Sequence, residues 1–261
     1  MPAHPSPAQD RPARVALVCG ATGAVGQAIC RGLADRGHPV AVHCRTDVAA
    51  ADLLVKELGA LVPATTVTGD LVSPERADAV VRSVADQLGA RPAVVVNAAY
   101  PRAGSCYLAD TDASEVEKHL DGFRMHANLC RSAIPGMRAA GWGRIVLIAG
   151  ALAGRFFPGL SLMSGVKAGM TSFSRAVALE EGPHGITVNV VSPGRLEFDD
   201  GGGAFDPDPA YELLDEVTRL RVALPTVPTP ADVATMVGFL ASEEAAAVTG
   251  QIVYVAGGEV I

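Results

Sequence analysis

The chain has 261 residues, and 49% of them are hydrophobic, so it is long enough and apolar enough to bury one large core. Its net charge of −7 argues against nucleic acid as a partner, because phosphate backbones attract basic surfaces. No stretch is long and apolar enough to span a membrane, and the five scattered cysteines contain no CxxC pair, which predicts reduced thiols in the cytoplasm.

The predicted elements begin after a proline-rich, polar stretch at residues 1–13, which we expect to be a disordered tail ahead of one domain over 14–261. Short apolar runs rich in β-branched residues then alternate with helical patterns, such as those over 24–37 and 73–89. This alternation predicts βαβ crossovers and an α/β fold with a doubly wound parallel sheet. The expected strands are 14–19, 39–44, 61–68, 93–97, 144–149, 187–191 and 251–256.

A glycine-rich turn follows the first expected strand. Gly20, Gly23 and Gly26 have the spacing GxxGxxG and precede a helical pattern, as in turns that bring backbone N–H groups close to a pyrophosphate. The second strand is followed by Arg45, whose guanidinium suits the 2′-phosphate of NADP. The sequence therefore favours NADPH, with NADH as a weaker cofactor; the alternative is that Arg45 is an ordinary surface arginine.

One segment, residues 195–230, interrupts the alternation of strands and helices. It contains three consecutive glycines and several prolines, followed by a stretch at 210–220 that could form a helix. A long irregular insertion after a strand is typical of a substrate lid. Its large apolar side chains, with two more from 154–160, could line a pocket for a flat hydrophobic ligand or could equally be core or subunit contacts; they are Phe198, Phe205, Leu213, Leu214, Phe156 and Phe157.

Four further motifs, in the expected order and spacing, give the chain from residue 14 onward a resemblance to the short-chain dehydrogenase/reductase family. They are GDL at 69–71, NAAY at 97–100, NVVSPG at 189–194 and FLASEEAAAVTGQIVYVAGG at 239–258. The resemblance implies a Rossmann fold, with Asp70 near the adenine and Pro193 and Gly194 bounding the nicotinamide pocket. The cofactor site that it implies comprises Gly20, Thr22, Gly23, Val25, Gly26, Arg45, Asp70, Leu71, Asn97, Ala98, Ala99, Lys167, Pro193 and Gly194.

The same resemblance implies a catalytic asparagine, serine, tyrosine and lysine, and of these only Lys167 is present. Met163 stands at the tyrosine position and Gly150 at the serine position, while the asparagine position falls near Gly122. Asn128 lies too far along the chain to match it unless a gap shifts the alignment. Tyr100 stands where the family has glycine. A thioether donates no proton and glycine has no side chain, so the usual proton donor is missing.

Two interpretations follow. In the first, the chain is an enzyme whose proton comes from elsewhere: from the substrate, or from Tyr100, whose other expected role is packing against cofactor or substrate. Weaker donor candidates are His126, Ser161, Ser164 and Tyr107, although either serine could instead cap a helix. In the second interpretation the chain is a catalytically inactive NADP-binding sensor or scaffold of the same family.

The composition, rich in alanine and proline, resembles that of actinobacterial proteins, among which this family reduces aromatic polyketides. The chain resembles ketoreductases of antibiotic pathways that act on angucyclinones such as that of simocyclinone. We therefore expect an NADPH-dependent ketoreductase for an aromatic ketone, with a homodimer or homotetramer formed through helices around 113–140 and 162–182. The histidines lack metal-ligand spacing, so no metal is expected, and the predicted substrate pocket comprises Tyr100, Gly150, Ser161, Met163 and Phe157.

Overall fold

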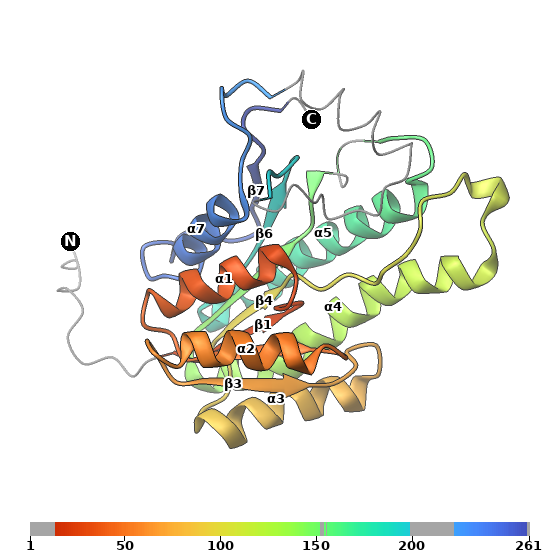
Figure 1. The fold of residues 1–261 in the computed structure, drawn as a ribbon. Coiled ribbons are helices and arrows are strands. Elements are labelled where there is room, and N and C mark those ends of the chain that lie inside the picture. Colours follow the sequence, from red (N-terminus) through yellow and green to blue (C-terminus); the bar gives the residue numbers. More distant parts are fainter. Residues whose placement is uncertain (1–13, 152–153, 155, 199–221, 260–261) are drawn as a thin grey trace.

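The computed structural model describes residues 14–151, 154, 156–198 and 222–259. Its centre is a seven-stranded parallel sheet with the order β3-β2-β1-β4-β5-β6-β7 (Figure 1), which confirms the predicted doubly wound α/β fold. The strands are β1 (Ala16–Cys19), β2 (Val40–Cys44), β3 (Ala64–Thr68), β4 (Val94–Asn97), β5 (Gly143–Ile148), β6 (Ile186–Pro193) and β7 (Ile252–Val255).

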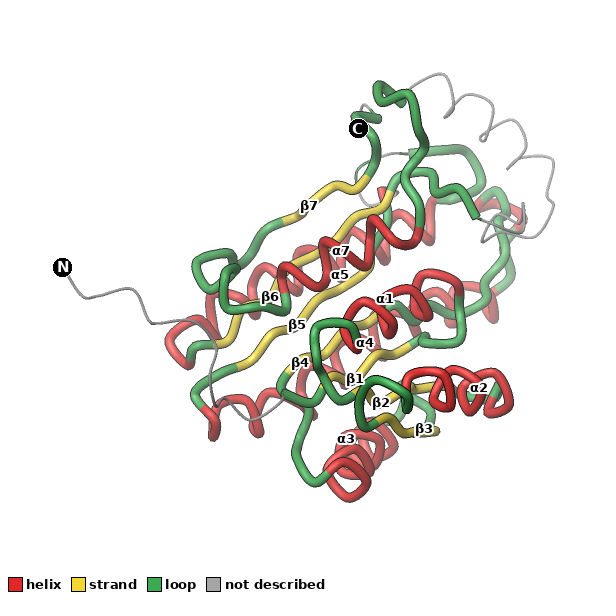
Figure 2. Tube along the Cα trace, turned by 60° about the vertical axis from the view of Figure 1, so that its left-hand side comes forward, coloured by secondary structure: helices red, strands yellow, loops and turns green. Residues whose placement is uncertain are grey.

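Helices cover both faces of the sheet (Figure 2), and short 3-10 helices lie at Leu108–Asp110 and Gly182–His184. One apolar cluster joins the sheet to α1 (Ala24–Ala34), α2 (Val48–Leu58) and α7 (Pro230–Leu240). A second cluster joins its other face to α3 (Pro74–Leu88), α4 (Ala113–Ala140) and α5 (Ser161–Glu181). Helices on both faces explain why several of the strands, such as β1 with the sequence ALVC, are apolar throughout rather than alternating.

Alternate residues of the central strand β1 supply the two clusters. Ala16 and Val18 pack on the side of α1 and α7, whereas Leu17 and Cys19 pack on the side of α3 and α4, and all four are fully buried. Successive side chains of a strand point to opposite faces, so this short strand anchors both helical layers. Its carboxyl end is thereby held rigidly, and the glycine-rich turn starts there.

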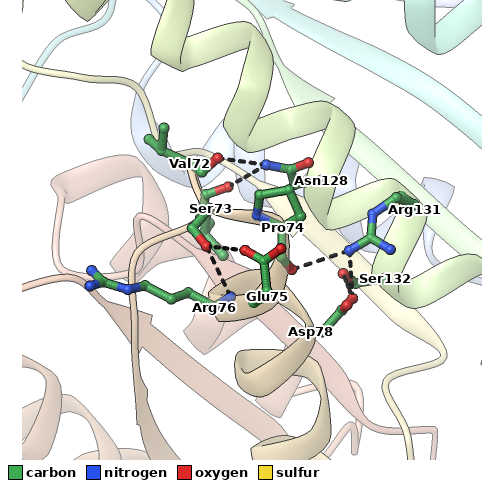
Figure 3. Close-up of polar contacts among 10 residues, drawn as sticks. Val72, Ser73, Pro74, Glu75, Arg76, Asp78, Asn128, Arg131 and Ser132 are labelled. Atoms are coloured by element: carbon green, nitrogen blue, oxygen red, sulfur yellow. Dashed lines mark hydrogen bonds and ion pairs between the residues drawn. The ribbon is translucent and has the colours of Figure 1, made fainter.

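The segment after β3 is held in place by α4 (Figure 3). The side-chain amide of Asn128 donates hydrogen bonds to the carbonyl oxygens of Leu71 (3.1 Å) and Val72 (2.8 Å). Arg131, one turn further along α4, pairs with Asp78 of α3 at 2.8 Å. Asn128 therefore has a structural role at the sheet edge, where it fixes the loop that follows Asp70.

Only the two ends of the predicted lid, 195–198 and 222–230, lie in the described part of the chain. Residues 199–221, with Phe205, Leu213, Leu214 and the expected helix over 210–220, lie outside the described residues, as does the predicted tail at 1–13. No helix in the described ranges is long and apolar enough to cross a membrane, and all five cysteines are free thiols.

Candidate active site

The candidate site lies at the carboxyl ends of the central strands, where the first turn is built for close backbone approach. Gly20 has φ +75°, and a Cβ there would lie 2.7 Å from the backbone of Ala98, so only glycine fits. A Cβ on Gly26 would lie 2.1 Å from the Gly20 carbonyl oxygen, so this glycine lets α1 begin directly against the turn. Both contacts fit the glycine roles of a dinucleotide-binding turn.

The N-terminus of α1 has free hydrogen-bond donors. Gly23 is its N-cap residue and supplies no side-chain cap, and no acidic residue stands in the first turn. Unsatisfied N–H groups and the helix dipole attract an anion at such a terminus. Thr22 and Val25, also expected at the cofactor, are partly buried beside this turn. The described residues therefore fit a bound pyrophosphate.

The end of β2 carries the expected specificity residue. Arg45 is exposed directly after the strand. Asp47, two residues later, is engaged as the N-cap of α2, where its carboxylate accepts a hydrogen bond from the Ala50 backbone at 3.2 Å. The N-terminus of α2 is therefore already capped by a carboxylate, so a 2′-phosphate here would depend on the exposed Arg45 and not on free helix N–H groups.

Two expected cofactor residues have side chains that face the protein. Leu71 is 1% exposed and packs in the core, so only its backbone is available to a cofactor. The Asp70 carboxylate accepts a hydrogen bond from the Val72 backbone at 2.9 Å and remains half-buried. Asp70 therefore has a carboxylate oxygen already committed to its own loop, which orients the side chain.

Asn97, at the end of β4, also turns inward. Its side-chain oxygen accepts a hydrogen bond from the Ala99 backbone (3.1 Å), and its amide lies 3.2 Å from Nδ1 of His126. The other His126 nitrogen lies 2.8 Å from the Ser174 hydroxyl, and burial lowers the pKa of His126 to about 4. Asn97 thus shapes the turn that carries Ala98 and Ala99, and His126 is a neutral core residue whose two ring nitrogens are both engaged.

The side chain of Tyr100 fills the space beside Gly122. A Cβ on Gly122 would lie 2.7 Å from Cε2 of the Tyr100 ring, so α4 has no room for a side chain at the expected asparagine position. The Tyr100 hydroxyl lies 2.9 Å from Nδ1 of His119, which is 2% exposed on the same helix. The two unusual residues at positions 100 and 122 are therefore in direct contact.

The Lys167 side chain extends from α5 toward the Tyr100 ring and Gly150. Its Nζ lies 5.2 Å from the centre of the Tyr100 ring, and a Cβ on Gly150 would be 3.3 Å from it. Burial lowers the pKa of Lys167 to about 8, which leaves the ammonium predominant at neutral pH. Met163, one turn earlier, is 4% exposed, and Pro193 at the end of β6 is also buried. The structure thus brings together Lys167, Tyr100, Gly150 and Pro193.

The remaining pocket candidates differ in their surroundings. Ser161 is exposed at the first position of α5, and Ser164 is buried with a hydroxyl that has no hydrogen-bond partner. The alternative that either serine caps α5 is wrong, because the N-cap residue is Leu160. Phe157 is half-buried, whereas Phe156 and Tyr107 are 75% and 66% exposed.

His119 is the residue that our sequence analysis missed. It lies three positions before Gly122, and residues three apart share one face of a helix. That face meets the turn after β4 and receives the Tyr100 hydroxyl. The sequence did contain a signal for this contact: His119 and Gly122 share one helix face, and Tyr100 stands where the family has glycine.

The fold and the glycine-rich turn define a dinucleotide-binding protein of the Rossmann class. Residues 20–259 match the family described as enoyl-(acyl carrier protein) reductase. The chain therefore belongs to the short-chain dehydrogenase/reductase family, whose members are NAD(P)H-dependent oxidoreductases, as predicted.

Individual relatives agree with this assignment. The chain is 31% identical over 249 residues to the 3-oxoacyl-acyl-carrier-protein reductase FabG of Pseudomonas aeruginosa, covering 94% of this chain and 96% of that one. It is 30% identical over 251 residues to the uncharacterized oxidoreductase YmfI of Bacillus subtilis, with 94% and 98% coverage. A crystal structure of a dehydrogenase/reductase from Sinorhizobium meliloti matches with TM-score 0.84 at 30% identity, covering 95% of each chain.

Proposed function

We propose that this protein is an NADPH-dependent ketoreductase that reduces a carbonyl group of an aromatic polyketide, an antibiotic intermediate, to an alcohol without a serine or tyrosine acid. The observation that carries the proposal is the half-buried Lys167, whose ammonium faces the backbone of Gly150 and lies one turn after the thioether of the buried Met163. The site offers charge and space but no hydroxyl at these two positions.

The cofactor assignment is supported by the glycine-rich turn and by Arg45. The free N–H groups of α1 would hold the pyrophosphate, and the exposed Arg45 guanidinium would bind the 2′-phosphate that distinguishes NADPH from NADH. When bound, NADPH supplies the hydride. The protein's own contribution is to orient the nicotinamide side against Pro193 and Gly194, and to place Lys167 beside the reacting carbonyl.

The Lys167 ammonium would stabilise the negative charge that develops on the carbonyl oxygen during reduction. A fixed charge in a site sheltered from water is more effective than one in bulk solvent, because solvent screens it less. The absence of side-chain atoms at Gly150 leaves room for a flat ring system in front of the ammonium. Phe157, half-buried in the segment before α5, would contact that ring system.

The proton would come from the substrate itself. In a hydroxylated aromatic polyketide, a phenol peri to the ketone forms an internal hydrogen bond to the carbonyl oxygen, and its pKa is about 10, like that of tyrosine. Transfer within one molecule has a high effective concentration, so a protein acid would add little. The phenolate that remains would regain a proton from solvent when the product leaves the site. This explains how an apolar Met163 is tolerated at the position where the family resemblance places tyrosine.

The test compares a peri-hydroxyketone with its peri-O-methyl ether as substrates, with NADPH oxidation as the readout. We expect the ether to be reduced roughly a hundredfold more slowly, the scale of removing a general acid. Equal reduction of both compounds would place the proton donor on the protein. Reduction of neither compound, despite tight NADPH binding, would favour the inactive sensor or scaffold.

Two further features belong to the same proposal. We infer a homodimer or homotetramer formed through α4 and α5, because α5 carries Leu179, a large apolar side chain that is 80% exposed. We also infer that the protein works in the cytoplasm, where its free thiols remain reduced.

A further inference from the structure

The Tyr100 side chain is held on three sides by residues of two helices, α4 and α5. Its hydroxyl meets His119, its ring edge meets Gly122, and its ring face lies 5.2 Å from the Lys167 ammonium. The turn after β4, α4 and α5 thus converge on one aromatic ring. Such a constellation requires the ring in one orientation, because each neighbour contacts a different part of it.

The hydroxyl of Tyr100 is committed to His119. The imidazole nitrogen Nε2 lies 3.4 Å from the Gly104 carbonyl oxygen, which can only accept, so Nε2 carries the proton and Nδ1 accepts from the tyrosine. Burial raises the pKa of Tyr100 and is the largest cause that lowers the pKa of His119. A phenol that donates to a buried neutral histidine, and that resists ionisation, is poorly suited to protonate a substrate.

The Tyr100 ring, unlike its hydroxyl, is placed to interact with the Lys167 ammonium. An ammonium within about 6 Å of an aromatic ring centre is attracted by the negative ring face, and the attraction grows when both are shielded from water. Glycine within a helix is unfavourable, so Gly122 needs a reason, and the reason is that a Cβ would strike the ring.

We propose that Tyr100 is a positioning residue that acts through its ring: His119 fixes the hydroxyl, Gly122 makes room for the ring edge, and the ring face holds the Lys167 ammonium toward the space beside Gly150. The effect on turnover rests on the ketoreductase function proposed above. The interaction between the Tyr100 ring and the Lys167 ammonium does not depend on that function, and it can be measured without any substrate.

A titration of Lys167 is influenced by the titratable and charged groups that surround its ammonium. The turn after β4 presents the Tyr100 phenol, and α4 presents His119, whose pKa is lowered partly by the Lys167 charge. The ends of β5 and β6 present Gly150 and the Pro193 carbonyl oxygen, which carry no charge. Both titratable neighbours are neutral near pH 8, so a change in the Lys167 titration after substitution of Tyr100 reports the ring.

The first experiment titrates Lys167 by NMR in full-length protein with ¹³C-labelled lysine. The chain contains three lysines, and Lys56→Arg with Lys118→Arg leaves only the signal of Lys167. Tyr100→Phe keeps the ring and removes the hydroxyl, whereas Tyr100→Leu keeps an apolar filling and removes the ring. We expect the pKa of Lys167 to be lower in the Leu variant than in the Phe variant by roughly 0.5–1.5 units. Equal values in the two variants would overturn the proposal.

The second experiment measures kcat against pH for the same variants with the peri-hydroxyketone, and NADPH affinity by fluorescence. We expect Tyr100→Phe to stay within about threefold of the parent, and Tyr100→Leu to lose roughly three- to tenfold at pH 8, where fewer molecules carry the ammonium. A Phe variant that binds NADPH but loses turnover as severely as the Leu variant would identify the hydroxyl as the chemical group. No turnover by the parent chain would count against the ketoreductase function and leave the NMR result valid.

A double-mutant cycle shows whether an effect comes from the contact between Gly122 and Tyr100 or from misfolding of one variant. Gly122→Ala should displace the ring and reproduce the Tyr100→Leu effects in the parent chain, but should add little in the Tyr100→Leu background. Gly169→Ala is the matched control, because its Cβ would make only ordinary contact with Phe123 at 3.9 Å. Additive effects of Gly122→Ala and Tyr100→Leu would show that the two residues act separately and would overturn the proposal.

Discussion

Lys167 and Met163 lie one turn apart in α5, and we expect them to respond very differently to substitution. Met163→Leu keeps an apolar side chain of similar volume, so it should cost less than about 1.5 kcal/mol in stability and keep most of the activity. Lys167→Ala removes the ammonium and should lower kcat by roughly a hundredfold or more. The check is kcat for both variants at saturating NADPH, with circular dichroism as the folding control; an equal loss would refute these roles.

A second prediction for a single residue concerns Arg45 and the preference for NADPH over NADH. Arg45→Ala should weaken NADPH binding by about 1.5–3 kcal/mol, the scale of a hydrogen bond to a charged group, because it removes the partner of the 2′-phosphate. NADH lacks that phosphate, so its affinity should hardly change. The dissociation constants of both cofactors, measured by fluorescence titration, give the answer; an equal weakening of the two would show that Arg45 does not discriminate between them.

At the scale of elements, the junction between β1 and α1 depends on glycine for lack of space. Gly26→Ala would place a Cβ 2.1 Å from the Gly20 carbonyl oxygen and 2.7 Å from the Ala21 Cα, so the turn must shift. We expect a loss of about 1–3 kcal/mol in the free energy of unfolding, together with weaker NADPH binding. Gly165→Ala is the control for urea denaturation and cofactor titration, because nothing lies within 4 Å of its added Cβ.

For the whole molecule, the C-terminal ends of α4 and α5 are joined by an ion pair between the exposed Arg138 and the buried Glu181. Glu181 is 3% exposed and accepts hydrogen bonds from Nε (2.7 Å) and Nη2 (2.6 Å) of Arg138, and these bonds are the main cause that lowers the pKa of Glu181. A depressed carboxyl pKa stabilises the fold at neutral pH, and this contribution is lost as the pH falls below about 4.5 toward the folded-state pKa.

Because solvent screens the exposed Arg138, Glu181→Gln should reduce the free energy of unfolding at pH 7 by only about 1 kcal/mol. The difference from the parent chain should shrink as the pH is lowered, because the parent then loses the same interaction. Urea denaturation at pH 7 and at about pH 4 measures both values. A difference that stayed constant over this range would show that the pair contributes through packing and not through charge.

The sequence predicted all seven strands of the sheet, because most of them are short apolar runs and β3 is a run of β-branched residues, and both differ from the amphipathic helices. The prediction failed at boundaries: β3 begins at Ala64, not at Leu61, since apolar residues also occur in the preceding turn. The lysine and the glycine-rich turn were also predictable, because they belong to local motifs. The contact of Tyr100 with His119 was not, because it joins residues 19 positions apart on separate elements, and only the tertiary packing brings them together.

The two glycines at positions 150 and 122 bear on how this active site can evolve. Gly150 has φ +89°, a conformation that serine rarely adopts, and the space for its side chain is limited by Lys167. Any side chain at position 122 requires Tyr100 to be replaced first. Restoring a hydroxyl-based site thus needs several simultaneous changes, each harmful alone. Descendants of this chain should keep glycine at both positions while the surrounding sequence changes. The loss of the family's catalytic hydroxyl groups is therefore difficult to reverse in evolution.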